Sequence, residues 1–255
     1  MRFSLLLVGL FITYCNGASR LAGGELTTIA HYPFAVALLT NSGAGSFAFS
    51  CGGTLVRANL VLTAAACVHN GESAHEAAWW RVRVGSSYSD RGGLIHLVRA
   101  ITVHPEFVMT PRAHDLAVLR PTIPVTLQPG LVEVARFAGA AYTFVETVPV
   151  TAIGWGEGAS SNQLQHVEIY PVNQALCNIR YNQLGVTISN DVVCAGLIDV
   201  GVRGQCEGDT GSPLVDSNGI VVGVFSWAEG CAHILYPGIN TRVSNYISWI
   251  ESVLE

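Results

Sequence analysis

Three kinds of side chain in this sequence could together attack a peptide bond: a hydroxyl, an imidazole and a carboxylate. The hydroxyls of Thr210 and Ser212 lie in one segment that contains glycine. Asp115 begins an apolar run, and His69 lies two residues after Cys67. In this chemistry the imidazole takes the hydroxyl proton and returns it to the leaving amine, while the carboxylate orients the imidazole. The sequence therefore predicts acyl transfer only if an imidazole can reach a hydroxyl.

The elements that must position these groups are mostly short strands. Turn-forming pairs of Asn, Ser and Gly separate β-rich runs. The runs cover residues 34–39, 53–63, 80–84, 96–103, 116–119, 148–153, 164–172 and 220–227. In the last stretch, Val243, Tyr246, Ile247 and Ile250 recur at helical spacing and predict one C-terminal amphipathic helix. The chain has 255 residues, half of them hydrophobic, which is enough for a large core, so we expect an all-β fold.

The first residues predict export from the cell. Arg2 precedes the apolar run 5–14, and small residues follow it, as in a secretory signal. The run is too short to span a bilayer, so we expect a signal peptide at residues 1–17 and no membrane association. Loss of Cys15 with the signal leaves six cysteines, and an even number in an exported chain favours disulfides over metal binding. Spacing alone leaves their pairing open.

The charged residues indicate the fluid in which the protein works. All 13 basic residues are arginine and none is lysine. Lysine loses its proton near about pH 10.4, whereas arginine stays charged above about pH 12. We therefore predict an alkaline extracellular compartment such as a gut lumen, with compositional drift as the alternative. The net charge of −5 offers no basic patch, which excludes nucleic acid as a partner.

Separated segments in fixed order carry a family resemblance. They are the junction 20–24, the run 51–67, the segment 115–119, the loop 206–215 and the pair 226–227, supported by residues 154–156, 194–196 and 237–243. Together they resemble the trypsin and chymotrypsin serine-protease family over nearly all of residues 21–255. The resemblance implies a single domain of two six-stranded antiparallel β-barrels with a short C-terminal helix and the site between the barrels. It also implies an activation peptide at residues 18–20.

The resemblance further implies how the scaffold is fastened and activated. The implied disulfides are Cys51–Cys67, Cys177–Cys194 and Cys206–Cys231. Cleavage after Arg20 would free the ammonium group of Leu21, which would pair with Asp209 and order the binding cleft.

The same resemblance assigns the binding groups. The backbone N–H groups of Gly208 and Thr210 would form the oxyanion hole. The specificity pocket would have Gly204 at its base and Ser226, Trp227, Ala228 and Gly238 around it. Because no acidic side chain stands at the base, the pocket is predicted to be apolar, and the methyl group of Ala228 favours small or medium hydrophobic side chains over large aromatic ones.

The triad-equivalent positions are Ala66, Asp115 and Thr210, of which only Asp115 matches the family's pattern. A methyl group cannot take a proton, and losing the base or the nucleophile costs roughly a millionfold in turnover. His69, His114 and Ser212 are the nearby substitutes, and each is assigned a structural role. We therefore expect no enzyme activity.

Three functions follow from this reasoning. The first is a secreted, catalytically inactive homologue, a monomer without cofactor or metal, that binds peptides, protease inhibitors or partner proteins through an apolar cleft. The alternative is an active elastase-like or chymotrypsin-like endopeptidase that uses Thr210 with an unorthodox base. The third is a decoy that sequesters protease inhibitors.

Overall fold

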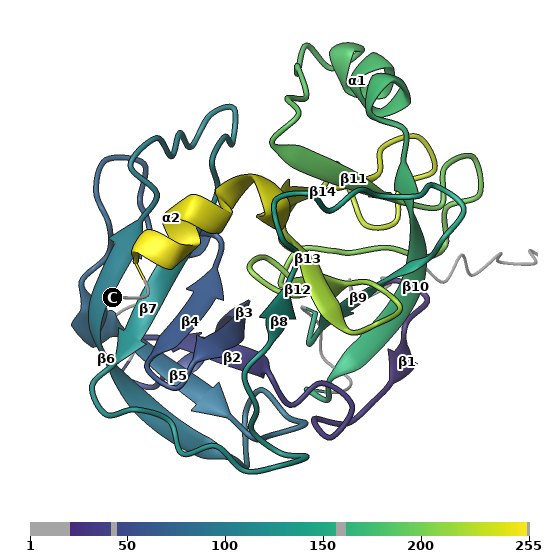
Figure 1. Ribbon diagram of the computed structural model, residues 1–255. Helices are drawn as coiled ribbons and strands as arrows, with labels where there is room; N and C mark the ends of the chain where they lie inside the picture. Colours follow the sequence, from purple (N-terminus) through teal and green to yellow (C-terminus); the bar gives the residue numbers. More distant parts are fainter. Residues whose placement is uncertain (1–20, 42–44, 157–161, 254–255) are drawn as a thin grey trace, which may run out of the picture.

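The structure is a computed structural model that describes residues 21–41, 45–156 and 162–253. Within these residues the chain forms two β-barrels side by side, with short helices at their margins (Figure 1). The expected signal peptide, residues 1–17, and activation peptide, residues 18–20, lie outside the described residues.

Six antiparallel strands close the first barrel in the order β2-β3-β4-β7-β6-β5. Their bounds are β2 (Ala35–Thr40), β3 (Ala48–Arg57), β4 (Leu60–Thr63), β5 (Trp80–Val84), β6 (Leu94–Val103) and β7 (Ala117–Pro121). Nearly every residue of β2 and β4 is buried in one apolar core. The β-rich run 53–63 spans the end of β3, a turn at residues 58–59, and β4.

The second barrel closes because β9 pairs with both β10 and β12. Its strands are β9 (Val150–Gly154), β10 (Gln165–Val172), β11 (Val192–Gly196), β12 (Pro213–Val215), β13 (Ile220–Trp227) and β14 (Gly238–Arg242). Two short strands join its margins: β1 (Glu25–Leu26) pairs with β10, and β8 (Arg136–Phe137) runs parallel to β13. The predicted pair of six-stranded antiparallel barrels is confirmed.

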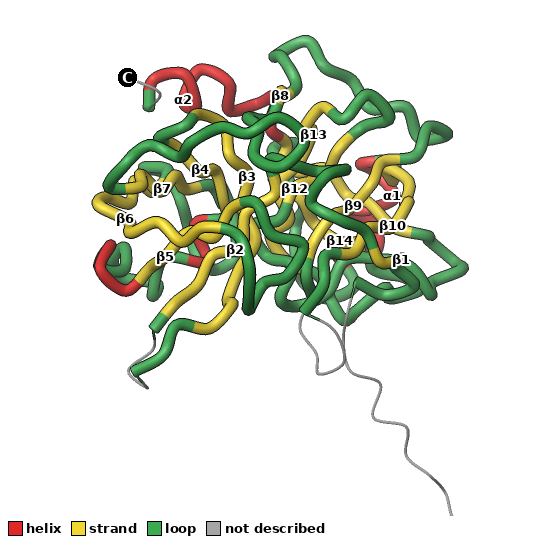
Figure 2. The backbone as a smooth tube through the Cα atoms, turned by 90° about the horizontal axis from the view of Figure 1, so that it is seen from below, coloured by secondary structure: helices red, strands yellow, loops and turns green. Residues whose placement is uncertain are grey.

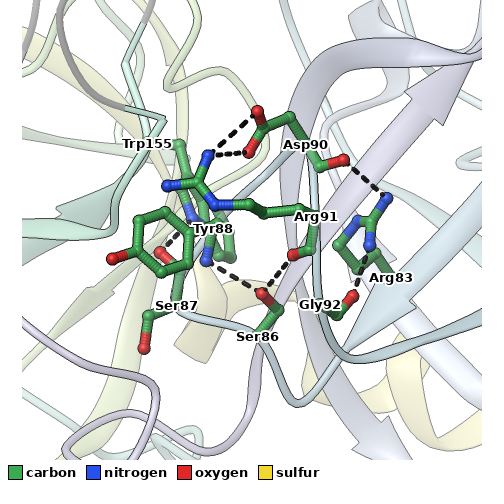
Figure 3. A network of polar contacts seen from close by, with 8 residues as sticks. All are labelled: Arg83, Ser86, Ser87, Tyr88, Asp90, Arg91, Gly92 and Trp155. Carbon is green, nitrogen blue, oxygen red and sulfur yellow. Dashed lines mark hydrogen bonds and ion pairs between the residues drawn. The ribbon is translucent and has the colours of Figure 1, made fainter.

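The loop between β5 and β6 ties the two barrels together. The carbonyl of Ser87 accepts the indole N–H of Trp155 at 3.1 Å and the N–H of Leu164 at 2.7 Å, and both donors flank strands of the second barrel. Within the loop, the hydroxyl of Ser86 donates to the carbonyl of Arg91 at 2.6 Å (Figure 3). Because the loop is braced internally and bonded across, it fixes how the barrels face one another.

The C-terminal segment returns from the second barrel to pack on the first. It begins as a 3₁₀ turn, η3 (Val243–Tyr246), and continues as α2 (Ile247–Ser252), which crosses the first barrel in Figure 1. Val243 and Ile250 are fully buried in the first core. The predicted C-terminal helix is thus confirmed.

A second helix, α1 (Gln174–Asn182), was not predicted. Its N-cap is Asn173, whose side-chain oxygen accepts the N–H groups of Ala175 and Leu176, as expected of a capping asparagine. Two further 3₁₀ turns, η1 (Ala65–Cys67) and η2 (Ala77–Trp79), lie in connections of the first barrel. The tube view shows the loops and turns that connect the strands (Figure 2).

Three disulfides join Cys51 to Cys67, Cys177 to Cys194 and Cys206 to Cys231, which are the pairs implied by the family resemblance. The first fastens η1, and the third fastens the loop before β12. Of the helices in the described residues, none is long and apolar enough to cross a membrane.

Candidate active site

Asp115 lies two residues before β7 and is 1 % exposed. Its Oδ1 accepts a 2.7 Å hydrogen bond from the backbone N–H of Ala66 in η1, and its Oδ2 accepts the hydroxyl of Ser226 in β13. The hydroxyl of Thr241 donates to the Asp115 carbonyl at 3.0 Å. The structure therefore brings Ala66, Asp115 and Ser226 together, and these bonds come from both barrels.

A cation that the sequence analysis missed stands beside this group. Arg112 Nη1 donates to the backbone carbonyl of Ser226. Burial raises the pKa of Asp115, whereas the Ser226 hydroxyl, the Ala66 N–H and the positive charge of Arg112 act in the opposite direction. A buried carboxylate needs such partners to remain ionised, so Arg112 supplies part of the compensation that an imidazole would otherwise give. Its signal in the sequence was only its nearness to Asp115.

Thr210 lies in the loop before β12 and is partly exposed. Its carbonyl accepts the N–H of Gly52 in β3 at 2.8 Å, which holds the loop against the first barrel. Gly211 has φ of 83°, and a Cβ there would lie 2.1 Å from the hydroxyl oxygen of Thr63. Only glycine fits this position. Gly208 is also left-handed, with φ of 89°, so its conformation is one that favours glycine at the predicted oxyanion loop.

Asp209 is completely buried between the two segments that it joins. Its carboxylate accepts the backbone N–H of Gly156 at 2.9 Å and that of Cys206 at 3.1 Å. Burial raises the pKa of Asp209 to about 7, and these two hydrogen bonds only partly offset that effect. Leu21 is also buried, in the core of the second barrel, and its neighbour Ala22 pairs with Gly204. The predicted ion pair between Asp209 and a freed Leu21 ammonium stays a prediction.

A pocket of about 430 Å³ opens beside Thr210. The residues that line it are Met109, Thr110, Pro111, Arg112, Val186, Glu207, Thr210, Phe225, Trp227 and Ala228. Three predicted site residues, Thr210, Trp227 and Ala228, are therefore brought together around it.

The two glycines expected to form the base and a wall of the specificity pocket do not line the observed pocket. Gly204 and Gly238 are buried and are not among the lining residues of this pocket. The ring of Phe225, which does line the pocket, approaches to 3.3 Å from the point where a Cβ of Gly238 would stand. Gln205, buried nearby, exchanges two amide hydrogen bonds with Asn240, at 3.1 and 2.9 Å. Neither Phe225 nor Gln205 was singled out in the sequence analysis.

The side chains considered as substitutes each have local partners. His69 Nδ1 accepts the N–H of Gly71 at 3.0 Å in its own turn. His114 Nδ1 lies 3.0 Å from the hydroxyl of Tyr246. The buried hydroxyl of Ser212 faces β3, because a Cβ added at Gly52 would lie 1.9 Å from it.

Comparison with known proteins agrees with this architecture. The profile of the family described as Trypsin matches residues 21–250. The chain belongs to the trypsin family. It is 42 % identical over 237 residues to "Trypsin, alkaline C" of Manduca sexta, which covers 91 % of this chain and 90 % of that protein. It is 38 % identical over 260 residues to "Trypsin CFT-1" of Choristoneura fumiferana, with 99 % of each chain covered.

These relatives correct the prediction that this trypsin-family chain is a binding protein without enzyme activity. Relatives that align over the whole domain are named trypsins, which are proteases, so that prediction is wrong. The sequence argument rested on Ala66 and Thr210 at the triad positions and on the structural roles assigned to His69, His114 and Ser212. The comparisons favour the alternative, a serine-type endopeptidase.

Proposed function

We propose that this chain is a secreted endopeptidase that hydrolyses peptide bonds in alkaline fluid, with Thr210 as the nucleophile and dissolved hydroxide as the base. The observation that carries the proposal is that Thr210 and Arg112 line the same pocket. A nearby positive charge favours the ionised form of an acid, so the guanidinium makes removal of the Thr210 proton less unfavourable.

Hydroxide is the base that this pocket admits. Ala66 carries only a methyl group, and no histidine is among the residues that line the pocket. Arginine stays protonated and cannot take a proton in this pH range. The concentration of hydroxide rises about tenfold with each pH unit, and the fraction of Thr210 present as alkoxide rises with it. An alkaline fluid thus supplies the base that the methyl group of Ala66 cannot provide.

The proposed reaction balances without a further reactant. Hydroxide removes the Thr210 proton and becomes water, and the alkoxide attacks the substrate carbonyl carbon. The electron pair of the carbonyl moves onto its oxygen, which the backbone N–H groups of Gly208 and Thr210 stabilise. When the carbonyl re-forms, the C–N bond breaks, and the leaving nitrogen takes a proton from water, which regenerates hydroxide. A second hydroxide attacks the ester carbonyl and displaces the Thr210 alkoxide; the new carboxylic acid gives its proton to that alkoxide.

The substrate class follows from the shape of the pocket. Phe225 occupies space beside Gly238, so the pocket is shorter than its glycine positions alone would make it. Ala228 adds a methyl group on the wall, and the base position, Gly204, carries no acid to bind a basic side chain. We infer that the residue before the cleaved bond has a short apolar side chain.

Three observations support an alkaline extracellular location. The chain contains arginine and no lysine. Three disulfides are typical of exported proteins. Relatives at 42 % and 40 % identity carry the word alkaline in their names. A melting temperature that holds between about pH 8 and 10.5 is expected, since arginine stays charged there; a collapse in this range would contradict the alkaline location.

The pH dependence of cleavage tests the mechanism. With short apolar peptides, log kcat/KM should rise by about one per pH unit from pH 7 to 10.5, with no plateau near the pKa of histidine. Thr210→Ala should remove this activity, while a contaminating protease would keep both the activity and its neutral plateau. Labelling of Thr210 by a fluorophosphonate, increasing with pH, would locate the nucleophile. Activity that is unchanged in Thr210→Ala would overturn the proposal.

A further inference from the structure

Three potential metal ligands meet beside the candidate active site, although they are separated in the sequence. His104 follows β6, Glu106 lies two residues later, and His114 immediately precedes Asp115. One nitrogen or carboxylate oxygen of each of the three side chains lies within 4.8 Å of the others. His104 is buried, His114 is partly buried and Glu106 is exposed, so the cluster opens to solvent through its carboxylate.

The two imidazoles are held in place by aromatic side chains of the C-terminal segment. The rings of His104 and His114 stack with centroids 5.3 Å apart and planes within 11°. His104 also packs against Tyr246, edge to face at 5.2 Å, and against Trp249 at 5.0 Å. Such packing limits the rotamers of both histidines, so less conformational entropy is lost when a ligand binds them.

The hydrogen bonds around the rings leave ligand atoms available. His114 Nδ1 lies 3.0 Å from the hydroxyl of Tyr246, which leaves Nε2 as the nitrogen that would bind a metal. A histidine ligand ordinarily uses its other ring nitrogen for a hydrogen bond of this kind. His104 Nδ1 accepts the backbone N–H of Glu106 at 3.2 Å, the long end of the hydrogen-bond range.

We propose that His104, Glu106 and His114 form a binding site for Zn²⁺. Two imidazoles and one carboxylate are a donor set that zinc accepts, with the fourth position left to water. With bonds of about 2.0–2.1 Å, ligand atoms of a tetrahedral site lie about 3.4 Å apart. The ligand atoms of the three side chains lie within 4.8 Å of one another, so the side chains must move inward when zinc binds, and that of Glu106 is exposed to solvent.

Zinc bound at this site would restrain the segment that carries Arg112 and Asp115. His114 has φ of 50°, a left-handed conformation, and it is directly followed by Asp115. Arg112, which donates to the Ser226 carbonyl, lies two residues before His114. Bound zinc would therefore fasten residues 104–114 at both ends and restrain Arg112 and Asp115 in their present places. This inference concerns binding and does not depend on the proposed catalytic mechanism.

Calorimetric titration with ZnCl₂ of the metal-stripped, Arg20-cleaved protein tests the site. We expect one equivalent to bind, and a rise in melting temperature of roughly 5 °C at a zinc concentration 100 times Kd. Co²⁺ should give the visible absorption of a tetrahedral complex. Glu106→Gln, at an exposed position, and His114→Asn, whose residue type tolerates left-handed φ, should each weaken binding by at least tenfold.

His233→Ala removes an exposed histidine outside the cluster and is the matched control, which should bind zinc like the unchanged protein. If His114→Asn proves unstable, Glu106→Gln alone still decides the question. Zinc binding that is equally strong in Glu106→Gln and in the unchanged protein, or no binding at micromolar zinc, would overturn the proposal.

Discussion

The backbone N–H of Ala66 donates a 2.7 Å hydrogen bond to Oδ1 of Asp115. Because the donor is a main-chain group, any residue at position 66 except proline can make this bond. The carboxylate is therefore held in one orientation whether or not the side chain at position 66 carries a base. A histidine introduced at position 66 would therefore meet a carboxylate that is already oriented.

Ala66→His together with Thr210→Ser should raise kcat/KM at pH 7.5 by at least a thousandfold, since the triad members act as a unit. The new ring must find room beside Asp115, which is buried, so a small loss of stability is expected. The pH profile is the sharper readout: it should change from a steady rise to a plateau above about pH 7. Peptide cleavage assays across pH 6–10.5 would show whether the plateau appears.

Arg112→Met tests the role assigned to the guanidinium. Methionine keeps much of the apolar stem but removes the charge and the hydrogen bond to the Ser226 carbonyl. Loss of alkoxide stabilisation should lower kcat at pH 10 by about tenfold, equivalent to one pKa unit of interaction. Arg112→Lys, which keeps a charge, should retain more activity at pH 8 than Arg112→Met. Equal kcat in all three proteins would show that the charge does not act on Thr210.

Phe225→Val should lengthen the specificity pocket. The ring is 1 % exposed, and its truncation leaves a cavity, so the free energy of unfolding should fall by about 2–3 kcal/mol. In return, the preferred residue before the cleaved bond should change from Ala or Val toward Leu or Phe. A series of peptides that differ only at that residue would measure the change in kcat/KM; an unchanged preference would mean that Phe225 does not limit the depth.

The stability of the uncleaved chain should depend on Asp209. Its folded-state pKa of about 7 lies above the ordinary value of 3.8, so the folded state binds more protons between these values. Stability should therefore fall as the pH rises from about 4 to 7, by up to roughly 4 kcal/mol. Denaturant unfolding at pH 4.5 and 8 would measure this loss, and Asp209→Asn should abolish it.

Cleavage after Arg20 provides the matched comparison for Asp209. If the Leu21 ammonium pairs with the carboxylate, it lowers the pKa of Asp209, and the loss of stability between pH 4.5 and 8 should shrink in the cleaved protein. An unchanged pH dependence after cleavage would mean that the ion pair does not form.

Local patterns in the sequence predicted an all-β fold and the C-terminal helix, and the family resemblance implied the two barrels and the disulfide pairs. Alternating apolar residues and turn-forming pairs specify strands locally, and the ordered motifs carry the family resemblance. It missed α1, because the helix presents only Cys177 and Tyr181 to the interior and so lacks a broad apolar stripe. It also placed Ala66 and Asp115 in one site, but from Ala66 and Thr210 at the triad positions it predicted an inactive homologue, which the relatives contradict.

Only the tertiary structure decided what surrounds these positions. Arg112 reaches the Ser226 carbonyl, Phe225 fills space beside Gly238, and His104 stacks on His114. Each contact joins residues from different strands and loops, and its existence depends on loop path and rotamer. A linear pattern records spacing along the chain, whereas these distances arise only when the two barrels and the C-terminal segment have packed together.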